Sequence, residues 1–189
     1  PFSSCRAGAT VKQITSFVWK TAFTFNIDDA LEAAYETTQH PKQKLESVNF
    51  DEHYRTSKDK SQLLAIHLHG FTRQSEKGYV FSSTEYARVT RGNNSWMHIL
   101  SELIASEPFI IAGTSLNEPD LEYYLAGRTE ATARTNRGPS ILVEPFPDKI
   151  TELLCKQHGL TLVKATMADF LGWLIATIGR TPSVSELTV

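Results

Sequence analysis

Apolar and polar positions along the chain follow two alternating patterns, which predict strands and helices in turn. Short runs rich in β-branched and aromatic residues predict strands, whereas apolar residues spaced three or four apart predict helices. The predicted strands are the runs TAFTFN, LLAIHLHG, PFIIAGTSL, ILVEP and LTLVKA, which start at residues 21, 63, 108, 141 and 160. The predicted helices span residues 11–20, 29–36, 82–89, 96–106, 118–128, 148–159 and 167–179.

Two segments do not follow this alternation. Residues 37–60 are polar and charged without a regular period, which predicts a surface excursion. The run YVFS at residues 79–82 predicts a short additional strand.

The order of the elements predicts the fold class. Buried strands that alternate with helices form a parallel sheet with helices on both faces, so we expect an α/β, Rossmann-like architecture. A length of 189 residues suits one domain, which we expect over residues 1–180, with a tail over residues 181–189. The initial Pro1 and this tail lead us to expect a fragment of a longer protein.

Composition narrows the class of protein. The chain is 41% hydrophobic and 21% charged, which is typical of a globular domain. A net charge of −2 with scattered Lys and Arg argues against nucleic-acid binding. Cys5 and Cys155 are too few for a disulfide framework, and no apolar stretch reaches the roughly 20 residues of a membrane span. We therefore expect a reduced, cytoplasmic setting and no membrane partner.

Polar clusters follow four of the predicted strands. They are NID after the first strand, HG after the second, GTSLNEPD after the third and EP after the fourth. Ligands of parallel α/β sheets bind beyond the carboxyl ends of the strands. We therefore expect the four clusters to line one cleft.

Each candidate residue also has a purely structural interpretation. Asp28 or Asp29 could cap the helix that follows, and Asn26 could form a turn. His69 could be a structural histidine with satisfied hydrogen bonds. His67 lies on the same strand face, which is a pattern of some metal sites, but no third ligand follows at a recognisable spacing. We therefore expect no metal.

The GTSL run offers small side chains and backbone N–H groups to a phosphate or ribose, and its alternative is a tight strand-to-helix turn. Glu118 and Asp120 follow it and are interpreted as solvated residues at a helix start.

Three motifs resemble the sirtuin family. They are TFNID at residues 24–28, LHG at residues 68–70 and GTSL at residues 113–116, in the order of the family. More closely, the chain resembles the sirtuin-like NAD-hydrolysing domains of bacterial anti-phage defence proteins. The resemblance covers residues 11–174.

The resemblance implies a role for each motif. Asn26 would hold the ribose hydroxyls or the attacking water, Asp28 would bind the nicotinamide carboxamide, and His69 would be the general base. NAD would be the substrate, with no metal involved. The resemblance further implies cofactor contacts for Thr24, Phe25, Gly113, Thr114, Ser115 and Glu144.

The chain departs from the family in two ways. The glycine-rich strand and loop that precede the TFNID motif in the family have no counterpart, because residues 6–9 (RAGA) come too early and follow no strand. The four cysteines that hold zinc in typical sirtuins cannot be supplied by two. These departures favour NAD hydrolysis over protein deacylation.

The resemblance therefore implies an NAD glycohydrolase that splits NAD into nicotinamide and ADP-ribose and acts in anti-phage defence by NAD depletion. The resemblance also implies a homo-oligomer, or a sensor, ATPase or Argonaute-like partner or fused domain. The alternative is a non-catalytic module of a defence complex that binds ADP-ribose or NAD, or that contributes an oligomer surface.

Overall fold

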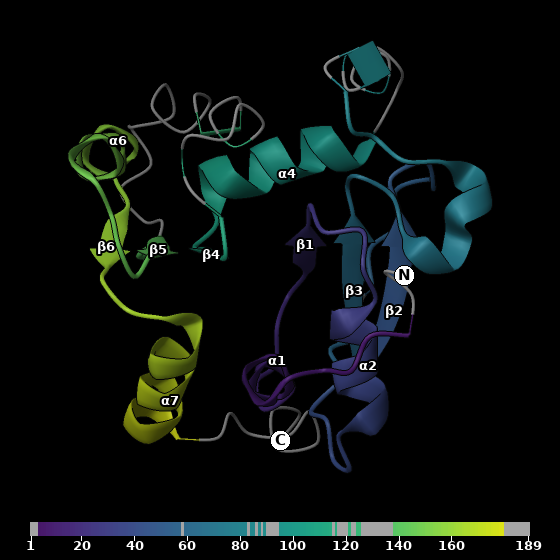
Figure 1. The fold of residues 1–189 in the computed structure, drawn as a ribbon, viewed down its shortest axis with the longest axis horizontal. Coiled ribbons are helices and arrows are strands. Elements are labelled where there is room, and N and C mark those ends of the chain that lie inside the picture. The colour runs from purple at the N-terminus through teal and green to yellow at the C-terminus, as the bar shows by residue number, and fades with distance from the viewer. Residues whose placement is uncertain are drawn as a thin grey trace. The chain divides into compact units, whose positions relative to one another are not determined.

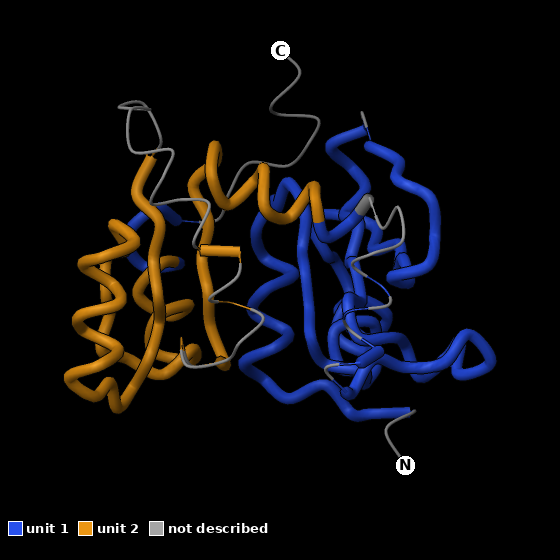
Figure 2. Tube along the Cα trace, turned by 90° about the horizontal axis from the view of Figure 1, so that it is seen from above, with its two compact units in different colours: residues 1–97, 175–189 blue, residues 98–174 orange. Residues whose placement is uncertain are grey.

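The computed structural model describes residues 4–57, 59–82, 84–85, 87, 89, 95–114, 116, 121, 124–125 and 138–179. The chain divides into two compact units, one of residues 1–97 and 175–189 and the other of residues 98–174 (Figure 2). The described strands form two three-stranded parallel sheets with flanking helices (Figure 1). The predicted α/β, Rossmann-like class is therefore confirmed.

The first sheet has the order β1-β3-β2, and both pairings are parallel. Thr24 of β1 and Asn49 of β2 both lie opposite His67 of β3, so the three strands end at the same level. The elements of this part of the chain are α1 (Ala9–Ile14), β1 (Ala22–Thr24), α2 (Ala30–Thr37), β2 (Lys44–Asn49), β3 (Gln62–His67) and the 3₁₀ helix η1 (Thr72–Lys77).

The central strand β3 forms the core of this sheet. Its five residues from Leu63 to His67 are all buried, as the continuous apolar run predicted for a strand that is covered on both faces. Each fully buried Leu or Ile contributes about 1.5–3 kcal/mol relative to an exposed one. The burial of β3 therefore fixes where β1 and β2 can pair.

The prediction of a surface excursion over residues 37–60 is wrong in part, because β2 lies within it. Lys44 and Glu46 give this strand a charged sequence, which is typical of the edge of a sheet. Only its last two residues, Val48 and Asn49, are buried. The apolar signal was therefore too short to predict the strand.

Two other local predictions are corrected. Residues 79–82, predicted as a short strand, have no strand assignment, and η1 precedes them where no helix was predicted. The helix predicted over residues 11–20 is shorter and earlier, since α1 ends at Ile14 and Thr15 caps it.

The second sheet has the order β4-β5-β6 and is also parallel. Its three strands were all predicted, and each is shorter than its apolar run. The remaining elements are α4 (Ser95–Ser106), β4 (Ile110–Ala112), β5 (Ile141–Val143), α6 (Lys149–His158), β6 (Thr161–Val163) and α7 (Met167–Ile178).

Asp148 and Gly159 set the two ends of helix α6. The Asp148 side chain accepts a hydrogen bond from the Thr151 N–H at 2.7 Å, and Gly159 ends the helix in the left-handed conformation, with φ 62°. The described helices include none that is both long and apolar enough to cross a bilayer.

Several predictions fall on residues outside the described part. Of the predicted helix over residues 118–128, Leu121, Tyr124 and Leu125 are described, and all three are helical. Residues 181–189 of the expected tail lie outside the described residues. The expected single domain over residues 1–180 stays a prediction.

Gly70, which ends the LHG motif, occupies a position that no other residue fits. Its φ is +100°, and a Cβ atom built there would lie 2.7 Å from the Gly78 carbonyl oxygen and 2.8 Å from Cδ1 of Tyr79. The adjacent Val80 N–H donates to the His69 carbonyl at 3.0 Å. Gly70 therefore lets the chain after β3 fold closely against residues 78–80.

We expect Gly70→Ala to lower the free energy of unfolding by about 2–4 kcal/mol, because left-handed strain adds to a steric clash. Gly159→Ala is the matched control, since φ is also positive there but nothing lies within 4 Å of the added Cβ. Gly159→Ala should lower the free energy of unfolding by about 1 kcal/mol. Urea unfolding of both variants checks this, and equal losses would contradict the close approach at Gly70.

Candidate active site

The segments that follow β1 and β3 lie side by side. The Leu68 N–H donates to the Thr24 carbonyl at 2.9 Å, and the Thr72 N–H donates to the Ile27 carbonyl at 2.9 Å. These two bonds continue the parallel pairing of the strands beyond their ends. The TFNID and LHG motifs, predicted to meet at strand ends, are therefore brought together in the first unit.

His69 and Phe25 form the contact between the two motifs. Their ring centroids are 5.1 Å apart and the ring planes are inclined by 55°, and both residues are half-buried. The His69 imidazole therefore lies against an aromatic surface at the carboxyl end of the sheet. Such a surface suits a flat ring such as nicotinamide.

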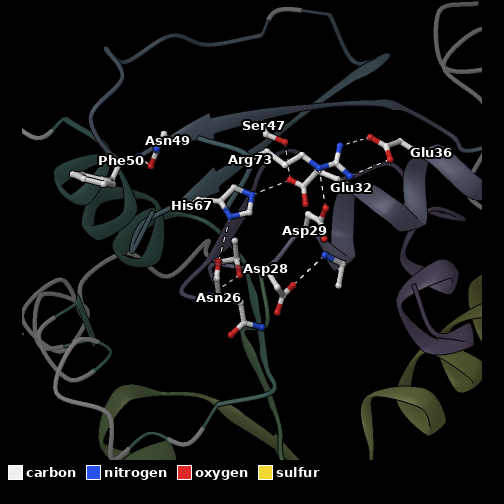
Figure 3. Close-up of polar contacts among 12 residues, drawn as sticks. Asn26, Asp28, Asp29, Glu32, Glu36, Ser47, Asn49, Phe50, His67 and Arg73 are labelled. Atoms are coloured by element: carbon white, nitrogen blue, oxygen red, sulfur yellow. Dashed lines mark hydrogen bonds and ion pairs between the residues drawn. The ribbon is translucent and has the colours of Figure 1, made fainter. Parts of the chain in front are cut away.

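Asn26 lies in an exposed turn directly after β1. Its N–H donates to Oγ1 of Thr24 at 3.0 Å, and its carbonyl lies 3.2 Å from Nδ1 of His67 (Figure 3). The turn-forming role that the sequence offered as an alternative is therefore real. The turn uses the backbone N–H and carbonyl of Asn26, whereas the residue is exposed. The Thr24 hydroxyl oxygen accepts the hydrogen bond that stabilises this turn.

Asp28 has the helix-start role that was its alternative interpretation. Its Oδ1 accepts a hydrogen bond from the Ala30 N–H at 3.0 Å (Figure 3). This bond uses one of the two carboxylate oxygens. Capping therefore does not exclude a contact with a ligand through the other.

Asp29, which the sequence offered only as a possible cap, fastens three segments together. Its side chain is buried and accepts from the Ser4 N–H at 2.9 Å, the Cys5 N–H at 2.8 Å and Nε of Arg73 at 2.9 Å. Arg73 also bonds both oxygens of the Glu36 carboxylate (Figure 3). The start of α2 is thereby tied to residues 4–5 and to η1.

The charge of Asp29 follows from these contacts. Burial alone would raise the pKa of Asp29, but the Cys5 N–H, the Arg73 guanidinium and the Ser4 N–H all stabilise the ionised form. Their sum holds the pKa of Asp29 well below its ordinary value. Asp29 is therefore a structural anion beside the candidate site.

His67 is a buried histidine with both ring nitrogens in hydrogen-bonding contact. Nδ1 faces the Asn26 carbonyl, and Nε2 lies 2.8 Å from Oε1 of Glu32. The ring also stacks on Phe71, with centroids 4.2 Å apart. Within the described ranges, no group of three or more His, Cys, Asp or Glu could hold a metal ion.

No role was predicted for Glu32 or Ser47. The Ser47 hydroxyl donates to Oε1 of Glu32 at 2.6 Å, and Glu32 is buried on α2. Burial would raise the pKa of Glu32, but the hydrogen bonds from His67 and Ser47 outweigh it and lower the pKa. A glutamate on the inward face of a helix was the one signal in the sequence that could have pointed to this cluster.

The second unit holds the other predicted contacts. Gly113, with φ +75°, and Thr114 follow β4, and Glu144 follows β5 at the same sheet edge, because Ala112 and Val143 are in register. Oε1 of Glu144 lies 3.3 Å from the Phe146 N–H. The predicted contact residue Ser115, and also Glu118 and Asp120, lie outside the described residues. The meeting of all four strand ends in one cleft stays a prediction.

A cavity of about 620 Å³ in the first unit is lined in part by Glu32 and Ser47. Its lining includes Tyr35 of α2, Lys44 at the start of β2 and Arg73, but none of Asn26, Asp28 and His69. It therefore adds nothing to the candidate active site.

Comparison with known protein families decides the identity of the fold. The model of the SIR2-like domain matches residues 20–163, which is more than half of the chain and includes all three motifs. The chain belongs to the SIR2-like domain family. No curated protein matches it. The family match confirms the predicted resemblance to sirtuins. Membership of a SIR2-like family implies the use of NAD.

We expect Asp29→Asn to lower the free energy of unfolding by about 2–4 kcal/mol at pH 7, because hydrogen bonds to a charged group contribute about 1.5–3 kcal/mol each. A depressed folded-state pKa stabilises the fold above the unfolded value of about 3.9, and this stability is lost as the pH falls further. The difference from the wild type should therefore shrink below about pH 4.

Urea titrations at several pH values measure this difference. Asp51→Asn, at a more exposed aspartate near Lys77, is the control and should change stability little at any pH. A difference for Asp29→Asn that stayed constant down to pH 2 would refute the role of the charge.

Proposed function

We propose that this SIR2-like domain is an NAD glycohydrolase that splits NAD into nicotinamide and ADP-ribose. The observation that carries the proposal is the contact of the His69 and Phe25 rings at the paired ends of β1 and β3, beside Asn26 and Asp28. An imidazole, an amide and a carboxylate thus come from two adjacent segments within a family that uses NAD.

The chemistry of this reaction suits those side chains. Nicotinamide leaves with the electrons of the glycosidic bond, while positive charge develops on the ribose. The site must orient the substrate, stabilise this charge and direct a water molecule. His69 would accept the proton of the attacking water, because a ring nitrogen of histidine can act as a general base.

Asn26 and Asp28 would complete the site. The exposed Asn26 amide can both donate to and accept from ribose hydroxyls or the water molecule. The oxygen of Asp28 that does not cap α2 can accept from the carboxamide N–H of nicotinamide. Phe25 would pack against the nicotinamide ring, and Thr24 would support the turn that presents Asn26.

For the second unit by itself, we propose that Gly113, Thr114, Ser115 and Glu144, which come after apolar runs in the sequence, are nucleotide contacts. Small residues allow a close approach to backbone N–H groups, and a carboxylate accepts from ribose hydroxyls. No metal takes part in this proposal.

In the cell, we propose that the protein acts in the cytoplasm as an anti-phage effector that depletes NAD. It would do so as a homo-oligomer or with a sensor, ATPase or Argonaute-like partner that controls it. The second candidate function is a non-catalytic module that binds NAD or ADP-ribose, because Asn26, Asp28 and His67 all have structural hydrogen bonds that a scaffold would also need.

The test is NAD turnover with product identification, by the full-length protein under conditions that permit assembly. We expect His69→Ala and Asn26→Ala each to lower kcat about 10²–10⁴-fold, as for loss of a general base or a positioning group. His40→Ala, at an exposed histidine of the same unit, should leave turnover unchanged.

Turnover that is indifferent to His69 and Asn26 would exclude this active site. Absence of turnover together with binding of ADP-ribose would favour the non-catalytic module instead.

A further inference from the structure

The Asn26 peptide is held from both sides, and the second partner comes from a buried cluster. Thr24 accepts from the Asn26 N–H, while the His67 imidazole faces the Asn26 carbonyl at 3.2 Å. A carbonyl oxygen can only accept, so Nδ1 of His67 must carry a hydrogen.

The other ring nitrogen of His67 is fixed in turn by Glu32. Oε1 of Glu32 receives both Nε2 of His67, at 2.8 Å, and the Ser47 hydroxyl, at 2.6 Å. Burial would raise the pKa of Glu32, but these two bonds lower it. The contact with Glu32 therefore fixes the orientation of the imidazole ring through Nε2.

Stability alone does not explain this buried pair of polar side chains. Side-chain exposure is 1% for His67 and 4% for Glu32, and Oε2 of Glu32 is buried without a hydrogen-bond partner among the described residues. Burying such a pair costs about as much in lost hydration as the contact returns, and apolar replacements of buried pairs are often neutral or stabilising. What an apolar pair cannot supply is a directed donor for the Asn26 carbonyl.

We propose that His67, oriented by Glu32 and Ser47, is a positioning residue that fixes the Asn26 peptide and thereby aims the Asn26 side chain. The inference rests on the proposed role of Asn26 in NAD hydrolysis. His67 touches no substrate in this scheme, and it acts through the backbone of Asn26. The cluster reaches Asn26 from three elements, since Ser47 lies on β2, Glu32 on α2 and His67 on β3.

Two substitutions of His67 separate its two hydrogen bonds. Asparagine carries its amide nitrogen near the position of Nδ1, so His67→Asn can keep the donor for Asn26 and lose Glu32. Glutamine carries its amide nitrogen near the position of Nε2, so His67→Gln can keep Glu32 and lose Asn26. Both variants replace the imidazole with a neutral amide and each can keep one of its two contacts, so they are matched to each other.

We expect His67→Gln to lower kcat about 10- to 100-fold with little change in KM, because a misplaced positioning group weakens the transition state more than the ground state. His67→Asn should lose less than about fivefold in kcat. Amide hydrogen exchange over residues 26–28 gives a second readout, and it should be faster in His67→Gln than in His67→Asn. His158→Gln, at a buried histidine of the second unit, is the control and should change neither readout.

Ser47→Ala keeps the side chains of His67 and Glu32 and removes only one bond to Glu32, so it is the variant to measure if the histidine variants do not fold. We expect a two- to fivefold loss of kcat and a measurable increase in exchange over residues 26–28. Unchanged values of both would overturn the inference.

The outcomes separate this inference from the proposed function. Equal kcat and equal exchange in His67→Asn and His67→Gln would overturn the positioning role, even if His69→Ala abolishes turnover. If the wild type did not hydrolyse NAD, the proposed function would fail, and the positioning role in catalysis would fail with it. Faster exchange in His67→Gln would then show only that His67 orders the Asn26 turn.

Discussion

The parallel pairing of β1 with β3 is the constraint on which the candidate site depends. It places Thr24 opposite His67, and the pairing continues past the strand ends through the bond between Leu68 and Thr24. Residues that are some forty positions apart in the sequence thereby share one sheet edge. Because side chains alternate across a strand, a shift of one residue in register would turn the His67 imidazole to the opposite face.

The same pairing explains why polar groups are buried at this edge. His67 takes the last position of β3 between its two neighbours, and α2 packs over it with Glu32 turned inward. Most positions of β3 contribute only apolar area to the sheet, whereas this one contributes directed hydrogen bonds. His67 therefore connects the buried Glu32 to the Asn26 turn, and the apolar residues of β3 hold His67 in place.

Much of this could be predicted from the sequence, and the failures have physical causes. Long apolar runs predicted β3 and β4, and Gly159 predicted the end of α6. Strand β2 was missed, because an edge strand needs few apolar residues. The contacts of Asp29 and Glu32 could not be predicted, since they join segments whose proximity only the folded chain creates.

The bracing of residues 26–29 has a consequence for the thermodynamics of binding. The Asn26 peptide, the Asp28 cap and the buried Asp29 are each hydrogen-bonded within the described structure before any ligand arrives. Ordering the backbone of a mobile residue costs about 1–2 kcal/mol in conformational entropy. The backbone of this turn is already ordered in the folded protein. A ligand that binds to it therefore loses less free energy to ordering the turn, and its affinity is higher.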